Sequence, residues 1–174
     1  MATESADDIA IGLLPALADS DIEQLADVLI DCVAGGASVN FMHPLGRDKA
    51  VAFWRRLAGD VAVGGRTLLV ARDAIGIVGT VQVVPAQPDN QPHRADIAKM
   101  LVHRRARRRG VGTALMRAAE NAAREAGKTL LVLDTATRRC RASLRTAWLD
   151  ACRRHSRLRA LAAGRVVQHQ LLLS

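Results

Sequence analysis

The sequence is poor in aromatic residues. Its 174 residues contain no tyrosine, two phenylalanines and two tryptophans. Stacking of bases on aromatic side chains contributes much of the affinity of single-strand nucleic-acid binders. This composition therefore argues against a protein of that class.

Paired cysteines, a basic leader and long apolar runs are also absent. The cysteines are Cys32, Cys140 and Cys152, and no two of them have the C-x-x-C spacing of a metal site. We therefore expect buried or incidental thiols, with no metal and no disulfide framework. Residues 1–8 are acidic where a secretory signal would be basic, and no apolar run approaches the length of about 18 residues that spans a membrane. These absences predict a cytoplasmic protein that does not bind a membrane.

The basic charge of the chain is confined to its last part. Residues 1–137 carry 16 lysines and arginines and 16 acidic residues, whereas residues 138–174 carry nine arginines and Asp150 as their single acid. The formal charge of +8 therefore belongs to the tail. The length and the hydrophobic content of 49% predict one globular domain. We divide the chain into this domain, residues 1–137, and an atypical arginine-rich tail, residues 138–174.

The hydrophobic periodicity predicts a mixed α/β fold. The last three segments form a strand–helix–strand crossover, which implies parallel neighbours, and an antiparallel hairpin precedes them. Phe41 and Met42, between the first two helices, either pack in the core or line a pocket. The predicted helices are 21–33, 48–63 and 112–126, and the predicted strands are 67–71, 77–84, 93–102 and 128–134.

A glycine-containing turn leads into the last predicted helix. Residues 107–113 read R-R-R-G-V-G-T. Gly110 and Gly112 remove side chains where backbone must approach a ligand, and the first turn of the helix has amides without intrahelical partners, which suit a phosphate. The alternative is an ordinary basic surface turn. A kinase-type P-loop is disfavoured, because G-x-x-x-x-G-K-[ST] does not occur.

These residues resemble motif A of the GCN5-related N-acetyltransferase (GNAT) superfamily. K-M-L-V-H at 99–103 runs into R-R-R-G-V-G-T-A-L-M at 107–116, and the family pattern Q/R-x-x-G-x-G/A maps onto Arg107, Gly110 and Gly112. Segments 35–42, 94–102 and 131–135 resemble acetyltransferases that confer tabtoxin resistance. The resemblance covers about residues 8–137 and implies a splayed central sheet flanked by helices.

The resemblance implies acetyl-CoA as the cosubstrate. The amides of residues 108–113 would cradle its pyrophosphate, and its pantetheine would lie between two splayed strands, 96–103 and 128–134. His103 could also be proposed as a base, although the resemblance favours a backbone contact. The implied cofactor-binding residues are Leu101, Val102, His103, Arg107, Arg108, Arg109, Gly110, Val111, Gly112 and Thr113.

Two carboxylates are candidates for handling the acceptor amine. Direct transfer needs an amine that loses its proton, a polarised carbonyl and a proton for the departing thiolate. Asp96 lies in the strand that would face the thioester, and Asp134 ends the neighbouring strand. The alternative is structural, with one aspartate capping a turn and the other on a solvated face. An amide of Val102 or His103 is a candidate oxyanion donor.

The tail departs from the family pattern. A tyrosine in the family's C-terminal segment usually protonates the thiolate, and this chain has none. Residues 138–150 read R-R-C-R-A-S-L-R-T-A-W-L-D, and we expect the tail to lack the closing strands. With one choice of codons for this segment, skipping one nucleotide yields G-D-A-E-R-L-Y-E-R-L-G-W-T. The alternatives are a reading-frame shift near codon 138 and a genuine basic tail.

The sequence therefore predicts an N-acetyltransferase that acts on a small primary amine. A cationic acceptor is favoured over an acidic one, with a toxin or antibiotic as an example from the resemblance. The resemblance also allows a homodimer, since family members often pair through C-terminal strands. The alternatives are an inactive acetyl-CoA-binding sensor, and a nucleic-acid-binding protein that uses its basic tail.

Overall fold

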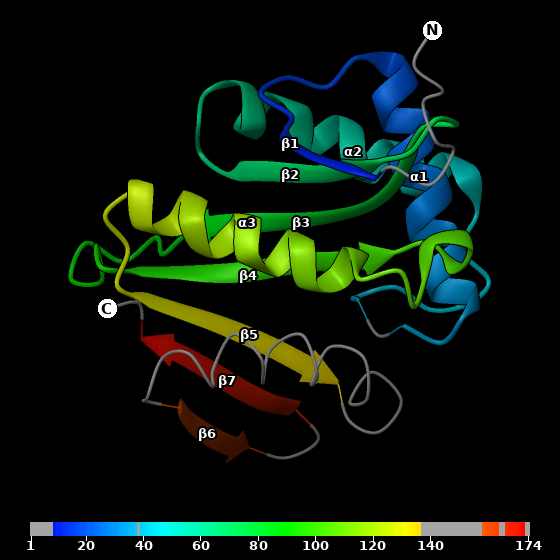
Figure 1. Cartoon of the computed structure of the whole chain (residues 1–174). Coiled ribbons are helices and arrows are strands. Elements are labelled where there is room, and N and C mark those ends of the chain that lie inside the picture. Colours follow the sequence, from blue (N-terminus) through cyan, green and yellow to red (C-terminus); the bar gives the residue numbers. More distant parts are fainter. Residues whose placement is uncertain (1–8, 38, 137–157, 164–165, 173–174) are drawn as a thin grey trace, which may run out of the picture.

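One mixed sheet organises the chain. The computed structural model describes residues 9–37, 39–136, 158–163 and 166–172. Its strands follow the order β1-β2-β3-β4-β5-β7-β6 (Figure 1). The elements are β1 Ala10–Leu13, α1 Asp19–Ala34, α2 Arg47–Ala62, β2 Thr67–Arg72, β3 Ile77–Pro85, β4 Arg94–Val102, the 3₁₀ helix η1 Arg104–Ala106, α3 Val111–Glu125, β5 Leu130–Ala136, β6 Leu158–Ala163 and β7 Val166–Leu172. This architecture confirms the predicted mixed α/β fold.

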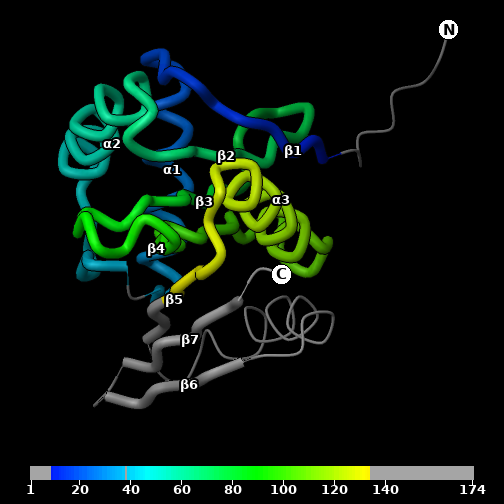
Figure 2. The backbone as a smooth tube through the Cα atoms, turned by 90° about the vertical axis from the view of Figure 1, so that its left-hand side faces the viewer, coloured from blue at the N-terminus to red at the C-terminus, as the bar shows by residue number. Residues whose placement is uncertain are grey.

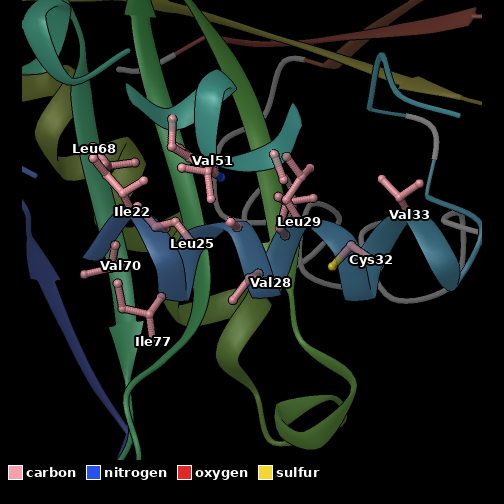
Figure 3. Packing of buried hydrophobic residues seen from close by; sticks show 14 of the residues in the cluster. Ile22, Leu25, Val28, Leu29, Cys32, Val33, Val51, Leu68, Val70 and Ile77 are labelled. Atoms are coloured by element: carbon pink, nitrogen blue, oxygen red, sulfur yellow. The ribbon is translucent and has the colours of Figure 1, made fainter. Parts of the chain in front are cut away.

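Helices cover both faces of the sheet. α1 and α2 lie on one face and α3 on the other (Figure 2). The core is divided accordingly, because the buried residues of α3 pack with β3 and β4 in one cluster, and those of α1 and α2 pack with β2 in a second (Figure 3). Leu25, Leu29 and Trp54 are fully buried in the second cluster. Truncating such a residue to alanine typically costs about 2–5 kcal/mol.

The strands β4 and β5 splay apart. Their parallel pairing runs from Arg94↔Leu130 to Ile97↔Leu133. Both strands continue beyond that register, β4 to Val102 and β5 to Ala136. Figure 1 shows them diverging toward the end of the sheet where α3 begins. Beyond Ile97 the two strands therefore no longer pair with each other.

A β-bulge lies in β4 at the beginning of the splay. The register with β3 shifts between Thr80↔Leu101 and Gln82↔Ala98. Two residues of β4, at 99 and 100, are thus opposite Val81, and Lys99 has a φ of 48°. Bulges bend a strand and redirect its side chains. This bulge places neighbouring side chains of β4 on faces that strict alternation would not give them.

The expectation that the tail lacks closing strands is wrong. β7 pairs with β5 from Leu130↔Leu172 to Ala136↔Val166, and β6 pairs with β7. The backbone of β5 would otherwise present an edge of unpaired N–H and C=O groups, and antiparallel pairing satisfies them without strict alternation of side chains. The segment 137–157, which includes Cys140 and Cys152, lies outside the described residues.

Candidate functional site

The N-terminus of α3 is built by two residues with left-handed backbone. Gly110 precedes the helix with φ 78°, and Arg108 has φ 64°. The first hydrogen bond of the helix runs from the N–H of Ala114 to the carbonyl of Gly110 at 3.0 Å. The N–H groups of residues 111–113, in the first turn of α3, therefore have no acceptor within the helix and suit an anion.

Neither glycine of the turn is required by internal packing. A Cβ on Gly110 would meet no atom within 4 Å, so its positive φ is what favours glycine there. A Cβ on Gly112 would lie 3.5 Å from Cε of Met100, which is an ordinary contact. The absence of a side chain at Gly112 therefore leaves space beside Met100 at the first turn of α3. This geometry fits the pyrophosphate of acetyl-CoA.

Arg107 points away from the turn and toward α1. Its Nε donates to the carbonyl of Val102 at 3.1 Å, and its Nη2 lies 3.7 Å from Oδ2 of Asp31. The thiol of Cys32 donates to the same carbonyl of Val102 at 3.4 Å. The arginine of the motif thus fixes the end of β4 against α1. The pKa of the Cys32 thiol is raised, because the side chain is buried.

Asp31 connects α1 to the segment that carries the turn. Its Oδ2 accepts a hydrogen bond from the N–H of Arg104 at 2.8 Å, and its Oδ1 accepts one from Nε of the same arginine. Nε2 of His103 lies 3.7 Å from Oδ1. The carboxylate is 7% exposed, so basic groups from three residues surround a buried charge. No local sequence pattern indicated this role of Asp31.

The structure corrects two of the implied contacts with pantetheine. The N–H of His103 donates to the carbonyl of Val78 on β3 at 2.8 Å, so it cannot serve as an oxyanion donor. Hydrogen bonding alternates along an antiparallel pair, and Leu101, opposite Thr80, therefore also directs its backbone to β3. Val102 directs its backbone to the other side, as its carbonyl partners show. Of the three backbone contacts with pantetheine that the resemblance implies near the end of β4, only the one at Val102 is compatible with this hydrogen bonding.

The imidazole of His103 is also engaged. Its Nδ1 accepts from the N–H of Arg105 at 3.2 Å, and its other nitrogen faces Asp31. These contacts hold the ring in a groove of about 490 Å³ that α1 forms with residues 75–77 and 103–105. The proposal of His103 as a base therefore has no geometric support.

Asp96 lies on the face of β4 opposite α3. Its neighbours Ala95 and Ile97 pack in the cluster that includes α3, and side chains alternate along a strand. Oδ1 of Asp96 accepts from Nε and Nη2 of Arg94 at 3.2 and 2.9 Å. No described residue donates to Oδ2, and the side chain is 45% exposed. The second oxygen can therefore receive an amine.

Asp134 is placed by its backbone alone. It lies in β5 opposite Gln168 of β7, one residue beyond the end of the pairing with β4. Its side chain lies outside the described residues, as do residues 1–8. Among the described residues, no cluster of histidine, cysteine and acidic side chains is arranged to bind a metal. In the same part of the chain, no helix has the length and apolar character needed to span a bilayer.

The sequence is similar to known acetyltransferases. It matches the acetyltransferase (GNAT) family over residues 42–145. An uncharacterized N-acetyltransferase from the hisH–hisA intergenic region of Azospirillum brasilense is 30% identical over 129 residues, which cover 73% of this chain and 75% of that protein. The matched family range includes the bulge in β4, the turn at 107–113 and α3.

Solved structures share the fold at lower identity. The structure of yncA from Salmonella typhimurium, with its cofactor acetyl-CoA, has a TM-score of 0.70 and 17% identity, covering 95% of this chain and 94% of that one. The ribosomal-protein-alanine N-acetyltransferase from Brucella melitensis has a TM-score of 0.67 and 17% identity, covering 94% and 99%. Such likeness establishes the common fold.

Proposed function

Because the chain belongs to the acetyltransferase (GNAT) family, we propose that it transfers the acetyl group of acetyl-CoA to the primary amine of a small molecule. When bound, acetyl-CoA supplies an activated acyl thioester. One observation carries the proposal: the open N-terminus of α3 lies beside the end of the sheet where β4 and β5 diverge (Figure 1). This arrangement offers both a phosphate site and strand edges for backbone pairing.

The residues around the turn would hold the cofactor in three ways. The amides of residues 108–113 would bind the pyrophosphate, with Gly110 setting the backbone and Gly112 leaving room. The positive charge of Arg108 and Arg109 would add attraction for phosphate. Val102 would pair with pantetheine through its backbone N–H, because its carbonyl already accepts from Cys32 and Arg107.

Asp96 would handle the acceptor amine. Its Oδ2 would attract a cationic amine and accept its proton, directly or through water, while Arg94 fixes the carboxylate through Oδ1. Asp134, at the end of the neighbouring strand, is the second proposed carboxylate. The chain has no tyrosine to protonate the thiolate, so another group or water has to supply that proton. We therefore expect slow turnover.

The finer assignments rest on the sequence. The resemblance to tabtoxin-resistance acetyltransferases supports a toxin or antibiotic amine as acceptor. A cytoplasmic location and a homodimer stay predictions. We also propose that residues 138–174 result from a reading-frame shift, which the abrupt change in charge and the lack of tyrosine support. Coding DNA without a family-like second frame across codons 138–174 would contradict the shift.

The proposed function is tested by incubating the full chain with acetyl-CoA and a panel of small primary amines. Release of the free thiol of CoA and the mass of the acetylated product are measured together. We expect acetylation of at least one amine above the uncatalysed rate, and the loss of that activity in Asp96→Asn. Binding of acetyl-CoA without acetylation of any amine would favour an inactive sensor.

A further inference from the structure

A cationic cluster lies on the face of the sheet that carries α1 and α2. We name it the Lys99 cluster, and its members are Lys99, Arg66, Gln82, Phe41 and Phe53. The ammonium of Lys99 lies 5.9 Å from the ring centroid of Phe41 and 5.3 Å from that of Phe53. It donates to the carbonyl of Val39 at 3.1 Å. The cluster therefore joins the loop between α1 and α2 to β4.

The bulge in β4 accounts for the position of Lys99. Met100 packs with the cluster beneath α3, and Leu101 packs with the cluster beneath α1. Lys99, with φ 48°, contacts two rings from the α1–α2 side, whereas strict alternation from Ile97 would place it on the α3 side. A left-handed backbone costs a non-glycine residue about 1–2 kcal/mol. Strain of this kind is often found where a side chain has a functional position.

The Lys99 cluster has more donors than acceptors. No carboxylate in the described part of the chain forms an ion pair with Lys99. Arg66 pairs with Asp60 and donates to Oε1 of Gln82 at 2.9 Å. Gln82 is 1% exposed, and its Nε2 has no hydrogen-bond partner among the described residues. A buried donor without a partner is costly, so the cluster is short of acceptors.

The charge on Lys99 also favours a bound anion. Burial lowers the pKa of Lys99, and repulsion from Arg66 lowers it further. An anion bound beside Lys99 would compensate both effects, since an opposite charge stabilises the ammonium.

We propose that the Lys99 cluster binds an acidic group of the acetyl acceptor, a carboxylate or a similar oxyanion. The inference rests on the proposed function and changes the expected acceptor from a purely cationic amine to an amine that also carries an acid. Asp96 lies on the same face of β4, three residues earlier. Residues at that spacing start about 10 Å apart along a strand, and the flexible lysine side chain shortens the span. Asp96 takes the amine of such an acceptor and Lys99 takes its acid.

Matched acceptors test the proposal. The probes are L-amino acids and their carboxamides. Loss of the carboxylate also lowers the pKa of the α-amine, so kcat/KM, measured with the full chain and acetyl-CoA, is expressed per concentration of unprotonated amine. We expect acids to be preferred over amides by about tenfold or more, since a hydrogen bond to a charged group contributes about 1.5–3 kcal/mol. Lys99→Met removes the preference by lowering kcat/KM for the acids alone, and Lys99→Arg restores part of it.

Lys49→Met is the matched control. Lys49 also lies over the Phe41 ring, at 6.0 Å, but it is exposed and belongs to α2. The control variant is expected to keep the preference for acids. Equal kcat/KM values for acids and amides in the wild type would overturn the proposal. An equal loss on both classes in Lys99→Met would also overturn it, because that result indicates a general structural effect.

Direct binding separates failure of this inference from failure of the proposed function. If no amine is acetylated, the proposed function fails, and binding of the same acids and amides is measured by saturation-transfer NMR. Selective binding of acids that is lost in Lys99→Met would sustain the anion site without catalysis. Equal binding of acids and amides, or no binding of either, would overturn the site.

Discussion

Oδ2 of Asp31 accepts a hydrogen bond from the backbone N–H of Arg104 at 2.8 Å, although the two residues are 73 positions apart in the sequence. The bond ties α1 to the segment that connects β4 with α3. The neighbouring Cys32 contacts the carbonyl of Val102, which also accepts from Arg107 (Figure 3 shows Cys32 on α1). α1 therefore fixes both ends of the segment that precedes the proposed phosphate site.

Asp31→Asn is predicted to destabilise the fold and to weaken the binding of acetyl-CoA. The substitution removes a buried negative charge that faces His103, Arg104 and Arg107. We expect a loss of about 1–3 kcal/mol in the free energy of unfolding, because the basic groups lose their charged partner. Urea unfolding and calorimetric titration with acetyl-CoA measure the two effects.

Asp27→Asn is the control for this change. Asp27 lies one turn earlier on α1 and pairs with Arg47, but its side chain is 53% exposed. Exposed ion pairs contribute about 0–1 kcal/mol, so we expect little change in stability and none in cofactor affinity. Equal effects of the two variants would show that Asp31 has no special role in holding the turn.

Gly110→Ala is predicted to destabilise the chain, whereas Gly112→Ala is not. Gly110 has φ 78°, and an L-residue in the left-handed region costs about 1–2 kcal/mol. Gly112 lies within α3, where its added Cβ would make an ordinary contact with Met100, and alanine is the better helix former. The free energies of unfolding of both variants check this order. A stable Gly110→Ala variant would contradict the backbone description.

Asp96→Asn is predicted to lower kcat and to leave acetyl-CoA affinity unchanged. The amide cannot accept a proton from the amine, and general base catalysis contributes about 10²- to 10⁴-fold. Oδ1 can still accept from Arg94, so the local fold is retained. Asp89→Asn, in the exposed loop before β4, serves as the control. Unchanged kcat in Asp96→Asn would remove Asp96 from the mechanism.

Lys99→Met is predicted to be at least as stable as the wild type at neutral pH. The pKa of Lys99 is lowered by burial and then by Arg66, so the folded state binds this proton less tightly than the unfolded state. The penalty is full below the folded pKa and disappears as pH rises past the ordinary lysine value. The advantage of Lys99→Met should therefore shrink toward pH 10–11, which unfolding at several pH values measures. A stability advantage of Lys99→Met that grows with pH would contradict a lowered pKa for Lys99.

Local patterns predicted most of the fold. The three helices and four of the strands were predicted within about two residues of their ends, because their apolar residues recur at regular spacing and glycines follow α1 and α2. β1 was missed, since it has four residues and is mostly exposed. β6 and β7 were missed because their pairing depends on the edge of β5 rather than on a local alternation.

The site was predicted in part. The turn at 107–113 was found from its glycines, and the structure gives Gly110 the positive φ that glycine permits. The side-chain partners of Arg107 and His103 could not be predicted, because Asp31 reaches them from a distant part of the sequence. The position of Lys99 depends on a bulge, which pairing with β3 creates. Contacts of this kind depend on residues that are distant in the sequence, so a local pattern cannot predict them.

The central claim is that the N-terminus of α3 holds acetyl-CoA, and a calorimetric titration of the full chain with acetyl-CoA tests it most directly. Wild type and Gly112→Ala are compared, because the added methyl group fills the space beside Met100 at the first turn of α3 while the fold is kept. The account predicts saturable binding by the wild type and affinity at least about tenfold weaker in Gly112→Ala, a difference of about 1.4 kcal/mol. No binding by the wild type, or equal affinity in both, would contradict it.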